Sequence, residues 1–193
     1  MSRVFVCSDL HFHHKNIITY ENRPWPDRDA MDAGLIARWN SVVLPSDTVY
    51  MLGDVGFCGK TKASELVHQL NGYKILILGN HDRGRAAGYW EDVGFDEVYN
   101  TYHLLCGDKH VAMMHEPPEQ TKPGIFCLYG HVHGHPEYPD WTEQSACVCM
   151  ERINYTPALL EDVLSGKAYA HRKNISADVN IDGSGSHCMC KEE

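Results

Sequence analysis

Short apolar runs alternate with polar segments along the first 130 residues of the chain, and five of these runs have the length of buried strands. They cover residues 3–7, 48–52, 74–78, 111–114 and 125–129. Continuous apolar runs of this length are typical of strands that are covered on both faces, as in the parallel sheets of α/β proteins. The pattern therefore predicts an α/β fold with several parallel strands in its core.

Apolar residues recur at helical spacing in other segments of the chain. This pattern predicts three helices, at 29–43, 62–70 and 156–164. The third is expected to begin with Thr156 as its cap and Pro157 at its first position, and to end before Gly166. The apolar face of the first helix predicts packing against the sheet and no cofactor site.

The remaining segments complete a single predicted domain. Residues 95–115 predict a hairpin that turns at Gly107, and residues 145–153 predict one further strand. No repeat or linker divides the chain before about residue 170, where small and polar residues become frequent. We therefore expect one domain at 1–170 and a polar, flexible C-terminal tail at 171–193.

The net charge and the cysteines indicate which binding partners and which cellular location to expect. The net charge is -9, from 17 basic and 26 acidic residues, which disfavours extended nucleic-acid binding because such binding normally needs a basic face. The first predicted strand leaves no room for a signal peptide, and no apolar run is long enough to cross a bilayer. Cys7 and Cys127 lie in predicted core strands, where free thiols act as small hydrophobic groups. We therefore expect a cytoplasmic protein with reduced cysteines and no membrane partner, and its oligomeric state remains open.

Candidate metal ligands follow each of the five predicted strands. They are Asp9 and His11, then Asp54, then Asn80, His81 and Asp82, then His115, and finally His131 and His133. Sites in open sheets form outside the carboxyl ends of the strands, so we expect these residues to gather at one edge. Carboxylate, imidazole and amide groups without a thiolate suit a catalytic site for divalent ions. A single Gly-Asp or Asp-x-His pair is an ordinary turn motif, but five such motifs in succession favour a metal site.

The order of these motifs resembles that of a known family. Asp9-Leu10-His11, Gly53-Asp54, Gly79-Asn80-His81-Asp82, His115 and Gly130-His131-Val132-His133 match the signature of the calcineurin-like metallophosphoesterases, between about residues 3 and 151. The resemblance implies a four-layer α/β/β/α sandwich with a dimetal site at the carboxyl ends of the strands. It implies that one ion is bound by Asp9, His11, Asp54 and His133, and the other by Asp54, Asn80, His115 and His131. It further implies that His81 is the catalytic histidine near the leaving-group oxygen and that Asp82 orients it.

The chemistry expected of such a site is phosphoester hydrolysis. A bridging Asp54 would hold two ions roughly 3.5–4 Å apart, and a hydroxide shared between them would attack phosphorus in line. His81 would donate a proton or a hydrogen bond to the departing oxygen. The ligand set accepts manganese, iron, zinc, nickel or magnesium, and we favour manganese.

Three functional hypotheses are compatible with these motifs, two for enzymes with different substrates and one for a protein without catalytic activity. The long segment between the first two motifs already contains a predicted helix, so we expect an open site without a cap domain. An open site on an acidic protein favours a phosphodiesterase or phosphatase that acts on small, nucleotide-like phosphoesters. A nuclease acting on DNA or RNA is the alternative, and it would need a basic groove. A non-catalytic metal-binding scaffold is disfavoured because His81 and every ligand are present.

Several residues near the motifs are candidates for substrate contact, although packing or solvation is the ordinary role of each. Lys15, Arg23, Arg83 and Arg85 are candidates for phosphate binding, and Arg83 is the strongest because it directly follows Asp82. Tyr20, Trp25, Phe57 and His135 are candidates for contact with an organic leaving group.

Overall fold

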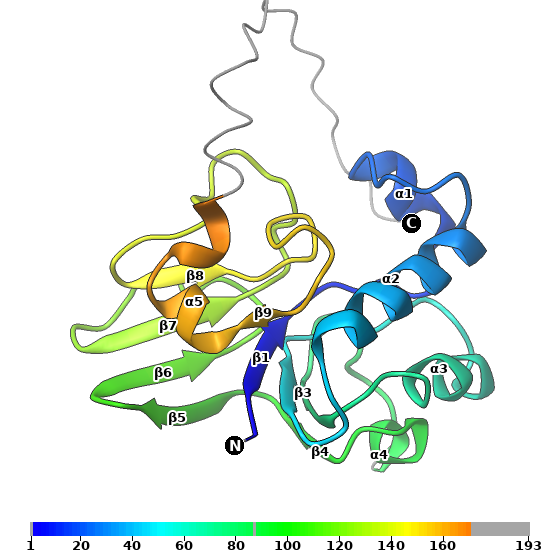
Figure 1. The fold of residues 1–193 in the computed structure, drawn as a ribbon, viewed down its shortest axis with the longest axis horizontal. Coiled ribbons are helices and arrows are strands. Elements are labelled where there is room, and N and C mark those ends of the chain that lie inside the picture. Colours follow the sequence, from blue (N-terminus) through cyan, green and yellow to red (C-terminus); the bar gives the residue numbers. More distant parts are fainter. Residues whose placement is uncertain (1, 87, 171–193) are drawn as a thin grey trace, which may run out of the picture.

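Two β-sheets form the centre of the computed structural model, which describes residues 2–86 and 88–170 (Figure 1). The first sheet has the order β4-β3-β2-β1-β9, with strands at Glu97–Tyr99, Tyr73–Ile77, Thr48–Met51, Val4–Cys7 and Ala158–Leu159. The second has the order β5-β6-β7-β8, with strands at Tyr102–Cys106, Lys109–Met113, Ile125–Tyr129 and Ser145–Cys147.

Helices flank the pair of sheets. They are α1 (Lys15–Tyr20), α2 (Arg28–Val42), α3 (Lys60–Val67), α4 (Tyr89–Val93) and α5 (Leu160–Leu164), followed by a short 3-10 helix at Lys167–Tyr169. Figure 1 shows α2, α3 and α4 beside the five-stranded sheet, whereas α5 lies apart from them, next to β9 and β1. This arrangement confirms the predicted α/β fold in which helices enclose two sheets. Within the described ranges, no helix combines the length and the apolar character needed to cross a membrane.

The register of the parallel strands brings their carboxyl ends together. Cys7 of β1 pairs with Met51 of β2, which in turn pairs with Leu76 of β3. In the second sheet, β6, β7 and β8 are also parallel to one another. A bridge between Ser8 and Cys149 connects the ends of the two sheets directly. The loops that follow these strands therefore meet at one edge of the molecule.

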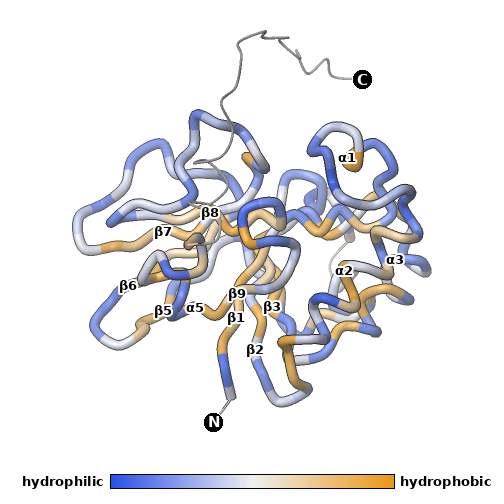
Figure 2. The backbone as a smooth tube through the Cα atoms, turned by 45° about the horizontal axis from the view of Figure 1, so that its top comes forward, coloured by the Kyte–Doolittle hydropathy of each residue, from blue (hydrophilic) through white to orange (hydrophobic). Residues whose placement is uncertain are grey.

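The core consists of apolar side chains from both sheets and from the helices. Figure 2 shows hydrophobic residues concentrated along the strands and hydrophilic residues in the connecting loops. In α2, Met31, Leu35 and Trp39 are fully buried at intervals of four residues, which is the spacing of one helix face. The Asp27 side chain accepts a hydrogen bond from the Ala30 N–H at 2.8 Å and so caps this helix.

The predicted elements agree best with the structure where the apolar pattern is strongest. The helix predicted at 29–43 is α2, displaced by one residue, and the hairpin turning at Gly107 is formed by β5 and β6. The helix predicted at 62–70 begins two residues earlier and ends three residues earlier, as α3. The six described cysteines are free thiols.

The helix predicted at 156–164 is wrong in its first half. Residues 158–159 form β9, which pairs antiparallel with β1, and the helix begins only at Leu160. Thr156 caps nothing, because its hydroxyl donates to the carbonyl of Asn154. Gly166 lies beyond the end of the helix with φ of 77°, as expected of a residue that terminates a helix.

Some short elements were missed by the prediction, and one strand was predicted to be longer than it is. The helices α1 and α4 have too few residues to show a clear period, and the prediction missed them. The strand β4 falls within the hairpin predicted at 95–115, but it pairs with β3 in the first sheet. The strand predicted at 145–153 ends at Cys147, where the chain leaves the second sheet to contact the end of β1. The predicted tail at 171–193 lies outside the described residues.

Candidate dimetal site

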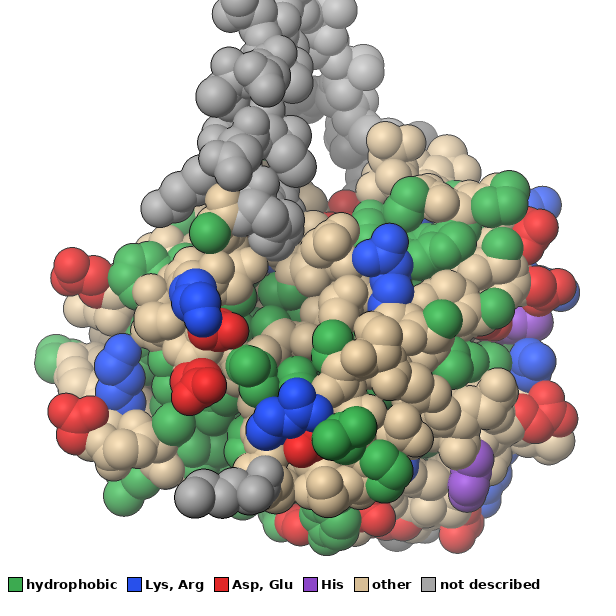
Figure 3. All heavy atoms as spheres, viewed as in Figure 1, with side chains coloured by type: hydrophobic (Ala, Val, Ile, Leu, Met, Phe, Trp, Pro, Cys, Tyr) green, Lys and Arg blue, Asp and Glu red, His purple; other side chains and the backbone are tan. Residues whose placement is uncertain are grey.

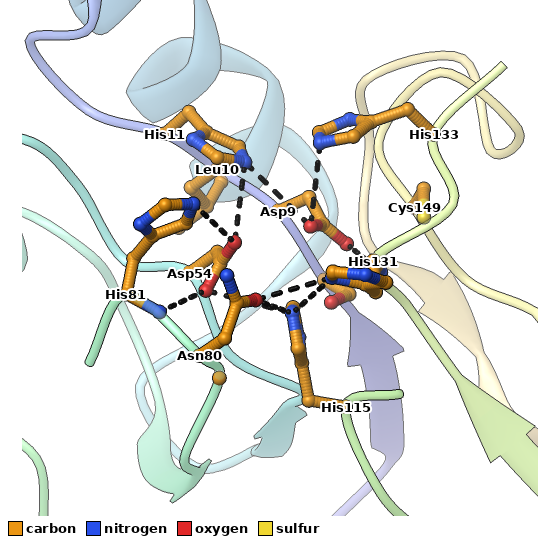
Figure 4. Close-up of polar contacts among 12 residues, drawn as sticks. Asp9, Leu10, His11, Asp54, Asn80, His81, His115, His131, His133 and Cys149 are labelled. Carbon is orange, nitrogen blue, oxygen red and sulfur yellow. Dashed lines mark hydrogen bonds and ion pairs between the residues drawn. The ribbon is translucent and has the colours of Figure 1, made fainter. Parts of the chain in front are cut away.

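The seven predicted metal ligands come together at the edge where the two sheets meet, and their side chains point toward one another (Figure 4). Asp9 and His11 follow β1, Asp54 follows β2, Asn80 follows β3, His115 follows β6, and His131 and His133 follow β7. The parallel order of the strands thus collects groups that are far apart in the sequence.

Asp9, His11 and His133 form one cluster of possible ligands. Oδ1 of Asp9 lies 3.6 Å from Nε2 of His11 and 3.6 Å from Nε2 of His133. These distances are too long for hydrogen bonds, and Asp9 Oδ1 and both ring nitrogens of His11 are buried without a hydrogen-bond partner. Buried polar groups rarely lack partners, so convergent unpaired donor atoms of this kind fit a divalent cation.

Asn80, His115 and His131 form a second cluster. Nδ1 of His115 lies 2.6 Å from the carbonyl oxygen of Leu52, so the ring donates its proton there and leaves a lone pair on Nε2. That Nε2 faces Oδ1 of Asn80 at 2.9 Å and Nδ1 of His131 at 3.3 Å. The lone pairs of His115 Nε2 and Asn80 Oδ1 face each other, and Nδ1 of His131 lies beside both, so a divalent ion could be held by this set of nitrogen and oxygen atoms.

Asp54 lies between the two clusters. Its Oδ2 is 3.6 Å from Nε2 of His11, and its Oδ1 is 3.5 Å from Nε2 of His115. Burial, together with the carboxylates of Asp9 and Asp82, raises the pKa of Asp54 to about 7. In the protein without metal, a proton therefore competes with a cation for this carboxylate near neutral pH.

Five of the seven predicted ligands have a left-handed backbone. Their φ angles are 63° at Asp9, 51° at His11, 56° at Asp54, 71° at His131 and 43° at His133. For residues with a side chain, this conformation costs on the order of 1 kcal/mol each. Hydrogen bonds hold it in place, including those from the N–H of Asp9 to Gly53 and from the N–H of His11 to Asp54, both at 3.0 Å. The fold therefore stores backbone strain at this site.

Glycines allow the ligand loops to approach one another, as predicted from their positions at the strand exits. A Cβ atom on Gly130 would lie only 1.9 Å from Oγ of Ser8, and one on Gly79 only 2.2 Å from Oδ1 of Asp54. Atoms of Ser8, Asp9 and Asp54 occupy the space that a side chain would need. An alanine at either position would push the ligands apart.

Asp82 has a different role from the one predicted. Its Oδ2 accepts the N–H groups of Asp54 at 2.7 Å and of Gly79 at 2.9 Å, and its Oδ1 accepts the N–H of Val55 at 3.1 Å. These bonds make the carboxylate fix the loops after β2 and β3, and among the described residues no hydrogen bond joins it to the ring of His81. The expectation that Asp82 positions the catalytic histidine is therefore corrected.

His81 lies at the rim of the site. Its Nε2 is 3.9 Å from Oδ2 of Asp54, and its side chain is 46% exposed. Its own N–H donates to Oδ1 of Asp54 at 3.1 Å, which anchors the backbone. Partial burial lowers the pKa of His81, and the exposed ring can donate an N–H hydrogen bond outward.

Arg23 and Glu151 form a buried network that the sequence analysis did not assign. Arg23 was a candidate for phosphate binding, but its buried guanidinium donates to the carbonyl oxygens of Asp9 and Leu10, each at 2.8 Å. It also pairs with Glu151 at 2.7 Å, so it is not available to a substrate. The Oε2 atom of Glu151 lies 3.2 Å from Nδ1 of His133. No motif marks Glu151 in the sequence, because only the folded chain brings it to His133.

The charges of this network reinforce one another. Burial opposes the charge of Glu151, but Arg23 and His133 lower the pKa of Glu151 to about 2. Burial likewise opposes a proton on His133, but Glu151 and Asp9 raise the pKa of His133 to about 9. The carboxylate of Glu151 is therefore the ion-pair partner on the Nδ1 side of His133, and Nε2 of the ring is directed at Asp9.

The other candidates for substrate contact lie in different surroundings. Arg83 is exposed beside the site, where Nη1 donates to Glu116 at 3.0 Å, whereas Arg85 lies over the ring of Tyr89. Trp25 packs edge-on against Tyr155 and covers Gly34, so its role is core packing.

We expect Glu151→Gln to weaken metal binding about 10–100-fold, because glutamine keeps the shape but loses the charge that holds His133. Competition with a chromogenic chelator at constant pH measures this change. Glu143→Gln, which removes an exposed carboxylate, serves as the control and should leave the affinity unchanged. Equal affinities of Glu151→Gln and the wild type would refute the role of Glu151.

Comparison with known proteins identifies the family. A model of the calcineurin-like phosphoesterases matches residues 2–181. An uncharacterised protein of Methanocaldococcus jannaschii is 35% identical over 170 residues, covering 83% of this chain and 89% of that protein. The gene 66 protein of Mycobacterium phage L5 is 42% identical over 166 residues, covering 69% of this chain and 78% of that protein.

A solved structure shares the fold. It is a protein of unknown function from Aquifex aeolicus, with a TM-score of 0.67 and 23% identity, covering 84% of this chain and 98% of that protein. Together, the sequence match and the site show that the chain belongs to the calcineurin-like phosphoesterase family. It is a phosphoester hydrolase, and its family implies divalent metal ions as cofactors.

Proposed function

We propose that the protein hydrolyses small, nucleotide-like phosphoesters, and phosphodiesters in particular, with two divalent metal ions. The observation that carries this proposal is the position of Asp54, whose two oxygens face two separate clusters of ligands. One ion would be held by Asp9, His11, His133 and Asp54, and the other by Asp54, Asn80, His115 and His131. When bound, the ions would supply Lewis-acid activation of water and stabilise negative charge on the phosphoryl oxygens.

The residues of the chain contribute orientation and proton transfer. His81 stands at the rim, where its N–H can reach the oxygen that leaves phosphorus, and this donation stabilises the developing alkoxide. Arg83 lies in the same loop, and its exposed guanidinium can bind a phosphoryl oxygen when it exchanges its contact with Glu116. Manganese as the preferred ion and a cytoplasmic location belong to this proposal, supported by the imidazole-rich ligand set and by free cysteines.

The surface favours a small substrate over a long nucleic acid. Asn80, His81 and His131 are exposed, so the site is open to solvent and can accept a group on each side of phosphorus. On the face shown in Figure 3, the lysine and arginine side chains stand apart and do not form a continuous strip. A polyanion would be repelled along its length by the acidic protein, whereas a small diester carries a single negative charge.

A metal-by-substrate activity matrix on metal-stripped protein tests the proposal. It combines each candidate ion with phosphomonoesters, phosphodiesters, cyclic nucleotides, single strands and duplex DNA. We expect small diesters to be hydrolysed at least as well as monoesters, and duplex DNA to be a poor substrate. Protein carrying Asp54→Ala, purified in the same way, controls for contaminating hydrolases. Efficient cleavage of nucleic acid with steep inhibition by salt would instead establish the nuclease alternative, because that dependence reports several phosphate contacts.

A further inference from the structure

Three aromatic rings extend outward from the metal ligands on the side of His81. They belong to Phe57, in the loop after β2, and to His14 and Tyr20, at the two ends of α1. The ring of Phe57 stacks on that of His14 with centroids 4.1 Å apart and an interplanar angle of 26°. The ring of His14 meets that of Tyr20 edge-on at 6.4 Å. We call these three residues the aromatic shelf.

The shelf remains substantially exposed although its rings are large. Phe57 is 40% exposed and Tyr20 is 68% exposed, and both rank among the few exposed large hydrophobic residues of the described chain. Exposed aromatic surface adds little to folding stability, because burial is the source of the hydrophobic gain. Aromatic faces beside a polar reaction site are, in contrast, suitable for stacking a flat ring.

The backbone holds the shelf in a fixed position. The N–H of Phe57 donates to the carbonyl oxygen of Phe12 at 2.8 Å, and Phe12 forms a bridge with Gly56. A Cβ atom on Gly56 would lie 2.6 Å from that same oxygen, so glycine permits this close approach. These contacts hold the loop after β2 against the loop after β1. The binding of a flat ring on Phe57 would therefore cost little conformational entropy, because the loop is already ordered.

The position of the shelf relates it to one side of the reaction. The centroid of the Phe57 ring lies 4.6 Å from that of His81, and 5.5 Å from that of the ligand His11. In the proposed function, His81 faces the oxygen that leaves phosphorus. A substituent on that oxygen would therefore extend over Phe57.

We propose that the aromatic shelf binds a flat ring carried by the leaving group, so that the preferred substrates are phosphoesters in which a nucleoside is the leaving alcohol. This inference rests on the proposed function. Methyl adenosine 5′-phosphate is a suitable substrate because it offers two different leaving alcohols. Water adds to phosphorus, the bond from phosphorus to the 5′ oxygen breaks, and that oxygen takes up a proton. The expected products are adenosine and methyl phosphate.

The decisive comparison uses the methyl ester of ribose 5-phosphate, which has the same ester linkage without the base. We expect kcat/KM to be about 10-fold higher for the adenosine ester, in line with the contribution of one stacked base. Phe57→Leu should bring the kcat/KM values of the two esters close to each other, whereas Phe57→Trp should retain the preference for the adenosine ester. Tyr99→Leu, an exposed aromatic residue on β4, is the matched control and should change neither rate. The metal content of Phe57→Leu should equal that of the wild type.

Two further readouts separate this inference from the proposed function. Release of AMP and methanol, in place of adenosine and methyl phosphate, would overturn the inference. In that case methanol would be the leaving alcohol, and the nucleoside would stay attached to phosphorus. Hydrolysis of both esters at equal rates would refute the proposed role of the aromatic shelf but would still support the proposed function. Calorimetric binding of AMP and ribose 5-phosphate to the metal-loaded protein gives a test without turnover. A preference for AMP that depends on Phe57, without hydrolysis of either ester, would support the shelf and refute the proposed function.

Discussion

Replacing Asp54 by alanine is expected to release most of the bound metal and to reduce hydrolysis below detection. The reason is geometric, because Asp54 directs one oxygen toward His11 and the other toward His115. Its removal would take a ligand from both ions and leave their charges facing each other without a carboxylate between them. Elemental analysis of the purified variant, together with hydrolysis of a small diester, measures both effects.

A second buried aspartate provides the matched control. Asp47 precedes β2, whereas Asp54 follows it, and its carboxylate pairs with Arg3 at 2.6 Å, away from the ligands. Asp47→Asn should lower thermal stability but keep the full metal content. Unchanged metal in Asp54→Ala would remove the bridging role, and metal loss in both variants would show that any damage to this strand releases the ions.

His81→Ala should keep both metals but lose activity according to the leaving group. With alkyl leaving groups, which need a proton donor, we expect a loss of roughly 10²–10⁴-fold. With an activated aryl leaving group the loss should be much smaller, because the departing oxygen is already stable as an anion. The measurement is kcat for a series of diesters, plotted against the pKa of the leaving alcohol for the wild type and the variant.

The slope of that plot distinguishes the possible roles of His81. A steeper dependence in the variant supports donation to the leaving oxygen. Equal losses across the whole series would instead assign His81 to electrostatic stabilisation of the phosphoryl group. His103→Ala, which removes an exposed histidine on β5, controls for the loss of an imidazole and should leave the series unchanged.

The positions of the strands and of the candidate metal ligands could be predicted because both depend on local sequence. A buried parallel strand needs a continuous apolar run, and a ligand at its end needs only to follow that run. The parallel order of β1, β2 and β3 then places Asp9, Asp54 and Asn80 at one edge. For this reason the α/β class and the gathering of the candidate ligands followed from a pattern read along the chain, whereas the division into two sheets was implied only by the family resemblance.

The parts that could not be predicted depend on contacts between distant segments. Residues 158–159 have no distinct strand pattern and become β9 only because they pair with β1. Glu151 becomes important only where the fold brings it to Arg23 and His133. Asp82 stands next to His81 in the sequence, but the N–H groups of Asp54, Val55 and Gly79 occupy its carboxylate. Such pairings leave no periodic signal in a single sequence.

The left-handed backbone at five predicted ligands has a consequence for how this protein can evolve. Glycine would adopt the same φ angles without steric cost, so exchanging Asp9 or His131 for glycine would relieve strain while removing a ligand. Selection for folding alone, in the absence of metal, would therefore favour the gradual loss of the site. Under the proposed function, the contribution of these side chains to metal binding would be the reason that they are retained in a conformation that glycine adopts with less strain.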